Sequence, residues 1–266
     1  MMSKIAIIGG GNLGSAIAEG LLSSGFTTPD NLYVTRRNTS LLEGLKAKGV
    51  HVLSDNQKAS ASADYIILAI KPFQVSEIIH EISPVLEGNR HTLISVVTGV
   101  WIQDLVELTA GKLPIVRAMP NTAIAIQESM TCTCMHKVTE TQQKFVTDLF
   151  NQLGKTVEID EKLMDAATVL GACGTAFAMR YIRANIQGGV EIGFNAKVAA
   201  VIAAQTVKGA ADLLLQHHTH PEQEIDKVTT PKGCTIAGLN EMEHRGLSSS
   251  IIRGITTSYK KIVEKM

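Results

Sequence analysis

The chain has 266 residues, of which 45% are hydrophobic, 19% charged and 4% aromatic, and its 25 Lys and Arg balance its 25 Asp and Glu. This length accommodates one large domain or two ordinary ones. A formal net charge of zero argues against a nucleic-acid-binding protein, and the apolar content excludes a disordered chain. No apolar run approaches the roughly 20 residues that span a bilayer, and the first residues lack a signal-peptide pattern. Neither a nucleic acid nor a membrane is therefore expected as a partner.

The cysteines and histidines give no sign of a disulfide framework or a metal site. Four cysteines occur without framework spacing, which favours a reducing, cytoplasmic compartment: Cys132, Cys134, Cys173 and Cys234. Cys132 and Cys134 lack the second ligand pair of a zinc site. The cluster of His217, His218 and His220 is explained by the end of a helix, where imidazolium complements the dipole. No metal is expected.

The first half of the chain alternates short apolar runs with amphipathic stretches, which predicts βαβ units and a parallel sheet. The expected strands are residues 4–8, 32–35, 51–53, 65–70, 92–97 and 115–118. A strand at 130–135, a helix at 139–152 and a strand at 156–159 complete this half. We place the first domain at residues 1–161.

The second half, residues 162–266, is predicted to be an all-helical domain. Helices are expected at residues 163–186, 196–217, 234–244 and 248–264. The apolar positions of helix 196–217 extend almost around its circumference, so it must be buried on several sides. A second copy of the chain is the favoured partner for it, and packing on the first domain alone is the alternative.

A glycine-rich turn follows the first strand and opens a helix of small and apolar residues. Gly9 permits the tight turn, Gly11 lets the backbone approach a pyrophosphate, and Gly14 lets the helix pack closely on the strand. The free N–H groups at the helix N-terminus would face the phosphates. This arrangement predicts a Rossmann dinucleotide-binding domain with a mostly parallel sheet; a glycine-rich turn that binds nothing is the alternative.

The end of the second strand indicates which dinucleotide is bound. The strand ends in Thr35, Arg36 and Arg37, without the acidic residue that usually holds the ribose hydroxyls of NAD. Guanidinium groups offer paired donors to phosphate oxygens and so suit a 2′-phosphate. We therefore predict NADP(H) as cofactor, with NAD(H) as the alternative if these arginines are ordinary surface charge.

Three further segments place polar groups where chemistry could occur. Lys71 and Pro72 follow the strand at 65–70, at the sheet edge where open α/β folds bind ligands. The strand at 115–118 is followed by the polar turn that contains Asn121. The loop at 226–239 opens a helix whose free N–H groups could hold a carboxylate. In the alternative reading of this loop, Thr230 caps a helix that starts at Pro231.

Taken in order, these motifs resemble the pyrroline-5-carboxylate reductase family over essentially the whole chain. The segments that carry the resemblance are residues 9–21, Ser54-Asp55-Asn56, 69–72, 117–122, His220-Pro221, 228–231 and Cys234-Thr235-Ile236. The resemblance implies a Rossmann domain followed by a helical domain that interlocks with a partner chain as a homodimer. It also implies NADPH-dependent reduction of 1-pyrroline-5-carboxylate to L-proline by hydride transfer to a cyclic imine.

The resemblance also assigns site residues. For the cofactor they are Gly9, Gly11, Asn12, Leu13 and Gly14 at the pyrophosphate, Thr35, Arg36 and Arg37 at the adenosine phosphate, Asn56 on the adenosine side, and Ala69, Lys71, Pro72, Val97, Thr98 and Asn121 at the ribose and nicotinamide. For the substrate they are Lys232, Gly233, Cys234 and Thr235, with Thr235 at the ring nitrogen. Thr235 and Lys71 are the expected catalytic residues.

The chain departs from the family pattern in three places. Residues 171–177 replace a Ser-Gly-Ser-Gly-Pro-Ala-Tyr stretch, Lys232 stands where Pro-Gly-Gly has its first glycine, and His218 stands where an acid can occur. These differences leave two alternatives open. One is a reductase of another small imino or keto acid, and the other is a non-catalytic NADP-binding regulatory protein.

Overall fold

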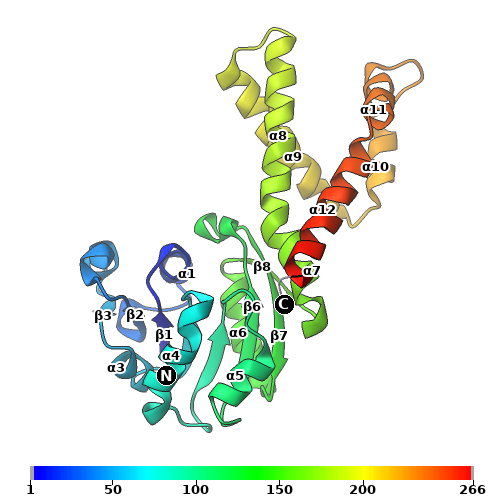
Figure 1. Cartoon of the computed structure of the whole chain (residues 1–266). Helices are drawn as coiled ribbons and strands as arrows, with labels where there is room; N and C mark the ends of the chain where they lie inside the picture. Colours follow the sequence, from blue (N-terminus) through cyan, green and yellow to red (C-terminus); the bar gives the residue numbers. More distant parts are fainter. Residues whose placement is uncertain (1–2, 265–266) are drawn as a thin grey trace. The chain divides into compact units, whose positions relative to one another are not determined.

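The computed structural model describes residues 3–264, and the chain divides into two compact units between Ala172 and Cys173 (Figure 1). The first unit is built on one eight-stranded sheet with the strand order β3-β2-β1-β4-β5-β6-β7-β8. The strands are β1 (Ile5–Ile8), β2 (Leu32–Thr35), β3 (His51–Leu53), β4 (Tyr65–Leu68), β5 (Thr92–Ser95), β6 (Ile115–Met119), β7 (Ser129–His136) and β8 (Gly154–Glu158). The predicted fold class, a mostly parallel sheet followed by a helical region, is confirmed.

The first six strands in chain order pair in parallel, whereas β7 pairs antiparallel with β6 and parallel with β8. Three strands are shorter than expected, and the first of them, β1, begins at Ile5 rather than at residue 4. β4 ends at Leu68 and β5 at Ser95, each two residues before the predicted end, because the chain leaves the ladder there for the loops at the carboxyl edge of the sheet.

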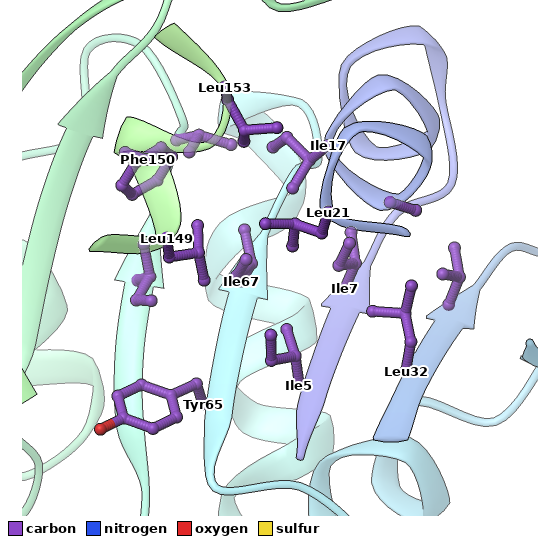
Figure 2. Packing of buried hydrophobic residues seen from close by; sticks show 14 of the residues in the cluster. Ile5, Ile7, Ile17, Leu21, Leu32, Tyr65, Ile67, Leu149, Phe150 and Leu153 are labelled. Carbon is purple, nitrogen blue, oxygen red and sulfur yellow. The ribbon is translucent and has the colours of Figure 1, made fainter. Parts of the chain in front are cut away.

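Helices cover both faces of this sheet. The helices of the first unit are α1 (Asn12–Ser23), α2 (Glu43–Ala47), α3 (Asn56–Ala61), α4 (Val75–Ile82), α5 (Ile102–Leu108), α6 (Glu140–Asn151) and α7 (Met164–Ala167). Since successive side chains of a strand point to opposite faces, Ile5 and Ile7 of β1 pack with α1 and α6, as Figure 2 shows. Ala6 and Ile8 pack on the other face with residues of α3, α4 and α5.

A buried cation joins β6 to the last segment of the first unit. The side chain of Arg117 is fully buried, and its Nη1 donates to Oε1 of Glu161 at 3.2 Å. Its Nη2 lies 3.8 Å from Oδ1 of Asp165, and its guanidinium carbon lies 5.2 Å from the centre of the Trp101 ring. The same Glu161 oxygen accepts a hydrogen bond from the backbone N–H of Ile102 at 2.7 Å. The cluster therefore fixes α5 and residues 161–165 to the sheet.

The second unit consists of α8 (Gly174–Glu191), α9 (Ala196–His217), α10 (Pro221–Lys227), α11 (Cys234–His244) and α12 (Leu247–Val263). The predicted bounds of α9 and α11 are confirmed. The residues of the helix predicted at 163–186 are all helical, but they do not form one α-helix: a π-helical segment, Thr168–Cys173, lies between α7 and α8, and α8 ends at Glu191. α10 was not predicted; its start is the His220-Pro221 pair, in which the ring of His220 accepts from the N–H of Glu222.

The helices of the second unit contain little core of their own. Among the described residues from 173 onward, only Ala199 and Ala203 are buried hydrophobic residues. Val201 of α9 is 67% exposed, and Leu215 is 62% exposed. Contrary to the expectation drawn from apolar runs, α9 is long and apolar enough to cross a membrane. No other helix among the described residues meets these criteria of length and hydropathy, and the core helix of a soluble protein can meet them as well. Its apolar surface requires a cover that a single copy of this unit does not supply.

We predict that Arg117→Met destabilises the first unit, because it leaves Glu161 and Asp165 facing each other without their cation. The free energy of unfolding should fall by about 3–5 kcal/mol, measured by urea denaturation. Lys144→Met is the control, since the Lys144–Asp148 pair is exposed and should leave the urea midpoint unchanged. An Arg117→Met protein with the wild-type midpoint would show that the cluster contributes nothing to stability.

Candidate functional site

A cleft of about 790 Å³ lies at the carboxyl edge of the sheet. Its lining residues come from the turns that follow β1, β2, β3, β4 and β5: Ile8, Gly9, Gly10, Gly11, Asn12, Leu13, Thr35, Arg36, Arg37, Asn38, Leu41, Ser54, Asn56, Ala69, Ile70, Lys71, Pro72, Gln74, Ile78, Val96, Val97 and Thr98. β1 lies between β2 and β4, so the chain leaves neighbouring strands in opposite directions at this point. Open α/β sheets bind ligands at such a point.

The three glycines of the turn do different things. Gly9 has a φ of +107°, and a Cβ there would lie 2.5 Å from the carbonyl oxygen of Ala69. A Cβ on Gly14 would collide with the carbonyl oxygen of Gly9, so α1 can lie this close to β1 only with glycine at this position. Around Gly11 no atom lies within 4 Å of the Cβ position, which leaves its backbone open to the cleft. These placements agree with the roles derived from the spacing.

The start of α1 suits an anionic ligand. Gly11 is the N-cap residue of α1, and no side chain caps the helix. The first N–H groups of the helix therefore keep their hydrogen-bonding capacity and the positive end of the helix dipole. Together with the open space at Gly11, they fit the pyrophosphate of a dinucleotide.

The two arginines after β2 differ in their surroundings. Nη1 of Arg36 donates to the carbonyl oxygen of Gly10 at 2.7 Å, so Arg36 helps to hold the glycine turn. The carbonyl oxygen of Thr35 accepts from the N–H groups of Gly9 and Gly10 at 3.2 and 2.6 Å. Arg37 is exposed and has no hydrogen-bond or ion-pair partner within residues 3–264. Arg37 thus has its whole guanidinium available to a ligand phosphate, whereas Arg36, which also lines the cleft, uses Nη1 in the turn.

The cleft continues to the ends of β4 and β5. Ala69, Lys71 and Pro72 line it after β4, and the backbone N–H of Lys71 donates to Oε1 of Gln74 at 3.2 Å. Val97 and Thr98 line it after β5. The Lys71 side chain is exposed, so its ammonium group can reach a polar or anionic ligand.

Two of the predicted cofactor residues lie outside the lining of the cleft. One is Gly14, whose place is the contact between α1 and the turn. The other is Asn121, whose Oδ1 accepts from the N–H of Ala123 at 3.0 Å, while its Nδ2 donates to the carbonyl oxygen of Gly171 at 3.3 Å. Both polar atoms of this amide bind the chain itself, and the nicotinamide contact of Asn121 stays a prediction.

Sequence reasoning did not assign several residues that line the cleft as cofactor contacts, although Ser54 and Ile70 lie in segments that carry the family resemblance: Ile8, Asn38, Leu41, Ser54, Ile70, Gln74, Ile78 and Val96. Most of them are immediate neighbours of predicted residues, so the strand-end rule that selected Lys71 and Thr35 would have found them too. Leu41, Gln74 and Ile78 are the exceptions, because they lie further along the chain and only the fold brings them to the cleft.

The predicted substrate residues lie in the second unit: Lys232 and Gly233 in the turn before α11, and Cys234 and Thr235 at the start of that helix. The N–H of Gly233 donates to the carbonyl oxygen of Thr230 at 2.9 Å, which closes a turn with Lys232 at a φ of +62°. α11 begins at Cys234, with Gly233 as its N-cap residue, so the alternative helix start at Thr230 and Pro231 is wrong. The physical reason is that Thr230–Gly233 form a turn in which Lys232 has a positive φ, so the helix can begin only after it.

The helix start at Cys234 and Thr235 is exposed, and no side chain caps it. Its free N–H groups can therefore donate hydrogen bonds to a carboxylate. Only glycine fits at position 233 without a shift of its surroundings, since a Cβ there would lie 2.6 Å from Oγ1 of Thr230. Within residues 3–264, no group of three or more His, Cys, Asp or Glu side chains could hold a metal ion.

We predict that two glycine variants separate folding from ligand binding. Gly11→Ala should keep the wild-type melting temperature, because space is free at its Cβ and its φ is −80°, but it should weaken dinucleotide binding about tenfold or more. Gly14→Ala should lower the melting temperature, because the clash is with backbone. Thermal unfolding and titration with the dinucleotide measure the two effects. Equal melting temperatures and equal dinucleotide affinities of the two variants would contradict the different roles assigned to Gly11 and Gly14.

Comparison with known proteins agrees with this cleft and with the helical second half. The family model "pyrroline-5-carboxylate reductase dimerisation" matches residues 161–265, and the model "NADP oxidoreductase coenzyme F420-dependent" matches residues 4–99. Pyrroline-5-carboxylate reductase 1 of Dictyostelium discoideum is 45% identical over 97% of this chain, which spans about half (49%) of that protein. Pyrroline-5-carboxylate reductase 2 of the same organism is 43% identical over 97% of this chain and 91% of its own length.

A solved structure extends the likeness to three dimensions. The crystal structure of Plasmodium falciparum pyrroline carboxylate reductase with NADP bound has a TM-score of 0.86 and 28% identity, and the match covers 98% of this chain and 97% of that one. Family models match both parts of the chain, and a relative at 43% identity is matched over nearly its whole length. This chain belongs to the pyrroline-5-carboxylate reductase family.

Proposed function

We propose that this protein is an NADPH-dependent oxidoreductase that reduces 1-pyrroline-5-carboxylate to L-proline, the last step of proline biosynthesis. The observation that carries the proposal is the likeness to pyrroline-5-carboxylate reductases over 97% of the chain, which includes both the cleft and the turn before α11. The reduced nicotinamide, when bound, supplies a hydride to the carbon of the substrate C=N bond, and the nitrogen keeps or gains a proton. The protein's task is to bind, align and desolvate.

The chain's own residues divide the binding of the cofactor. The Gly9–Gly11 backbone and the N-terminus of α1, with Asn12 and Leu13, hold the pyrophosphate. Arg37 pairs with the 2′-phosphate of the adenosine, while Arg36 keeps the glycine turn in place through Gly10. Because Arg37 is the available cation, NADPH is preferred over NADH.

The turn before α11 holds the substrate. The free N–H groups at the start of α11, with Gly233 and Cys234, bind the carboxylate, and Lys232 adds a cation beside them. The hydroxyl of Thr235 hydrogen-bonds the ring nitrogen and so orients the C=N bond. Lys71 contributes a second cation at the end of β4, where it contacts ribose or the anionic substrate.

The protein also functions as a homodimer in the cytoplasm. We assign residues 1–161 to dinucleotide binding and residues 162–266 to dimerisation and substrate binding, in keeping with a dimerisation match that begins at residue 161, although residues 162–172 pack with the first unit. The exposed apolar residues of α9 support a second copy as the cover for this helix. The four cysteines are all free, which suits a reducing compartment.

The test of the function is oxidation of NADPH by racemic 1-pyrroline-5-carboxylate, followed at the nicotinamide absorbance with proline identified as product. We expect turnover, and a kcat/KM that is higher with NADPH than with NADH. Arg37→Ala should reduce this preference about tenfold or more, through the loss of a charged hydrogen bond, and Arg36→Ala should also disturb the turn. The absence of turnover with this substrate would refute the proposal. Turnover only with another cyclic imine or keto acid would identify the protein as a reductase of another small imino or keto acid.

Thr235→Ala should lower kcat roughly 10- to 100-fold while the Kd for NADPH stays near the wild-type value, because Thr235 contacts only the substrate. Thr235→Ser is the matched control, since it keeps the hydroxyl group and should retain most of the rate. An unchanged rate in Thr235→Ala would remove this residue from the site.

The dimer is tested by light scattering of the purified protein. We expect a mass of at least two chains, and we expect Val201→Glu, which places a charge on the exposed apolar face of α9, to lower it. Val157→Glu is the control, because Val157 is 49% exposed on β8 in the first unit. A stable, active monomer of the wild type would contradict the proposal.

A further inference from the structure

Asn56 occupies a wall of the cleft at the first residue of α3. The helix start is secured by its neighbour, since Oδ1 of Asp55 accepts from the N–H of Lys58 at 2.8 Å. The capping bond therefore leaves the Asn56 side chain without a role in the helix. Its amide carries a donor end and an acceptor end, and which end meets a ligand decides what the ligand must offer.

Glu81 of α4 determines the orientation of this amide. Nδ2 of Asn56 donates to Oε2 of Glu81 at 3.0 Å. An ionised carboxylate only accepts hydrogen bonds, so the NH₂ end of the amide must face Glu81 and the carbonyl end cannot. The backbone of Glu81 is itself tied to α3, because its carbonyl oxygen accepts from Nε2 of Gln57 at 2.6 Å. Within residues 3–264, Oδ1 of Asn56 has no hydrogen-bond partner and remains an acceptor.

We propose that Glu81 is a positioning residue for the cofactor: it locks the Asn56 amide so that Oδ1 accepts a hydrogen bond from a hydroxyl or amino group of the adenosine half of the dinucleotide. The inference rests on the proposed function only in taking NADPH as the ligand of the cleft. Glu81 acts through Asn56 and does not touch the ligand. Without it the amide turns freely about its last torsion and presents an acceptor for only part of the time.

The positioning role of Glu81 and its negative charge predict opposite changes in dinucleotide affinity when Glu81 is removed. A carboxylate beside a cleft for a polyanion repels the ligand, so its removal by itself should tighten binding. Loss of a locked acceptor should weaken binding instead, by the value of one neutral hydrogen bond. The sign of the change in affinity therefore separates positioning from electrostatics.

The experiment measures the Kd of NADPH and of 2′-phospho-ADP-ribose, which lacks the nicotinamide, by calorimetry on the full-length protein. We expect Glu81→Ala to raise both Kd values about three- to tenfold, and Asn56→Ala to raise them by a similar factor. The double variant should bind no more weakly than Asn56→Ala alone, since Glu81 acts only through that amide. Glu77→Ala is the matched control, an exposed glutamate on α4, and should bind as the wild type does.

Kinetics and the binding of a cofactor fragment provide the remaining readouts. Glu81→Ala should raise the KM for NADPH while kcat stays near the wild-type value, and reduced nicotinamide mononucleotide, which has no adenosine, should bind both proteins equally. An unchanged or tighter Kd in Glu81→Ala, or a double variant with additive losses, would overturn the inference. Failure of the proposed function is distinct, because the wild type would then fail to bind NADPH or would bind it without reducing 1-pyrroline-5-carboxylate.

Discussion

The backbone between β1 and α1 passes closer to its neighbours than a side chain would allow, and the rest of the cleft depends on this approach. Gly9 lies against the carbonyl of Ala69 at the end of β4, and Gly14 lies against the carbonyl of Gly9. These contacts set the N-terminus of α1 directly over the edge of the sheet, where β1 separates β2 from β4. Thr35 and Arg36 then hold the turn from β2: the carbonyl of Thr35 accepts from Gly9 and Gly10, and Arg36 donates to the carbonyl of Gly10. Phosphate binding and strand packing are thus two results of one backbone path.

Charge in this protein is local in effect, although the chain as a whole is neutral. Arg117 uses its charge inside the first unit, where Glu161 and Asp165 balance it. Arg37 and Lys71 keep theirs at the surface of the cleft. Burial separates these roles: a buried guanidinium needs its counter-ions at all times, whereas an exposed one can exchange water for a ligand phosphate at little cost.

The packing of the second unit leaves large apolar side chains exposed. α8 and α9 approach through small residues, and a Cβ on Gly189 would lie 3.1 Å from the Cβ of Ala199. Close packing of this kind brings backbones together but buries few large side chains, so larger apolar residues such as Val201 and Leu215 stay exposed in the single chain. An interface with a second copy is the way such a helix pair acquires a core.

The sequence by itself determined the sheet, the glycine turn and the long helices, because alternation within a strand, helical periodicity and glycine spacing are properties of neighbouring residues. β2, β3, α9 and α11 have the predicted bounds for this reason. The tertiary structure alone decided the partners of side chains that lie far apart in the chain. Arg36 is tied to Gly10, Asn56 to Glu81, Asn121 to Gly171 and Arg117 to Glu161, over separations of 26, 25, 50 and 44 residues. Local pattern cannot specify such pairs, since they exist only once strand order has brought the ends of distant strands and helices together.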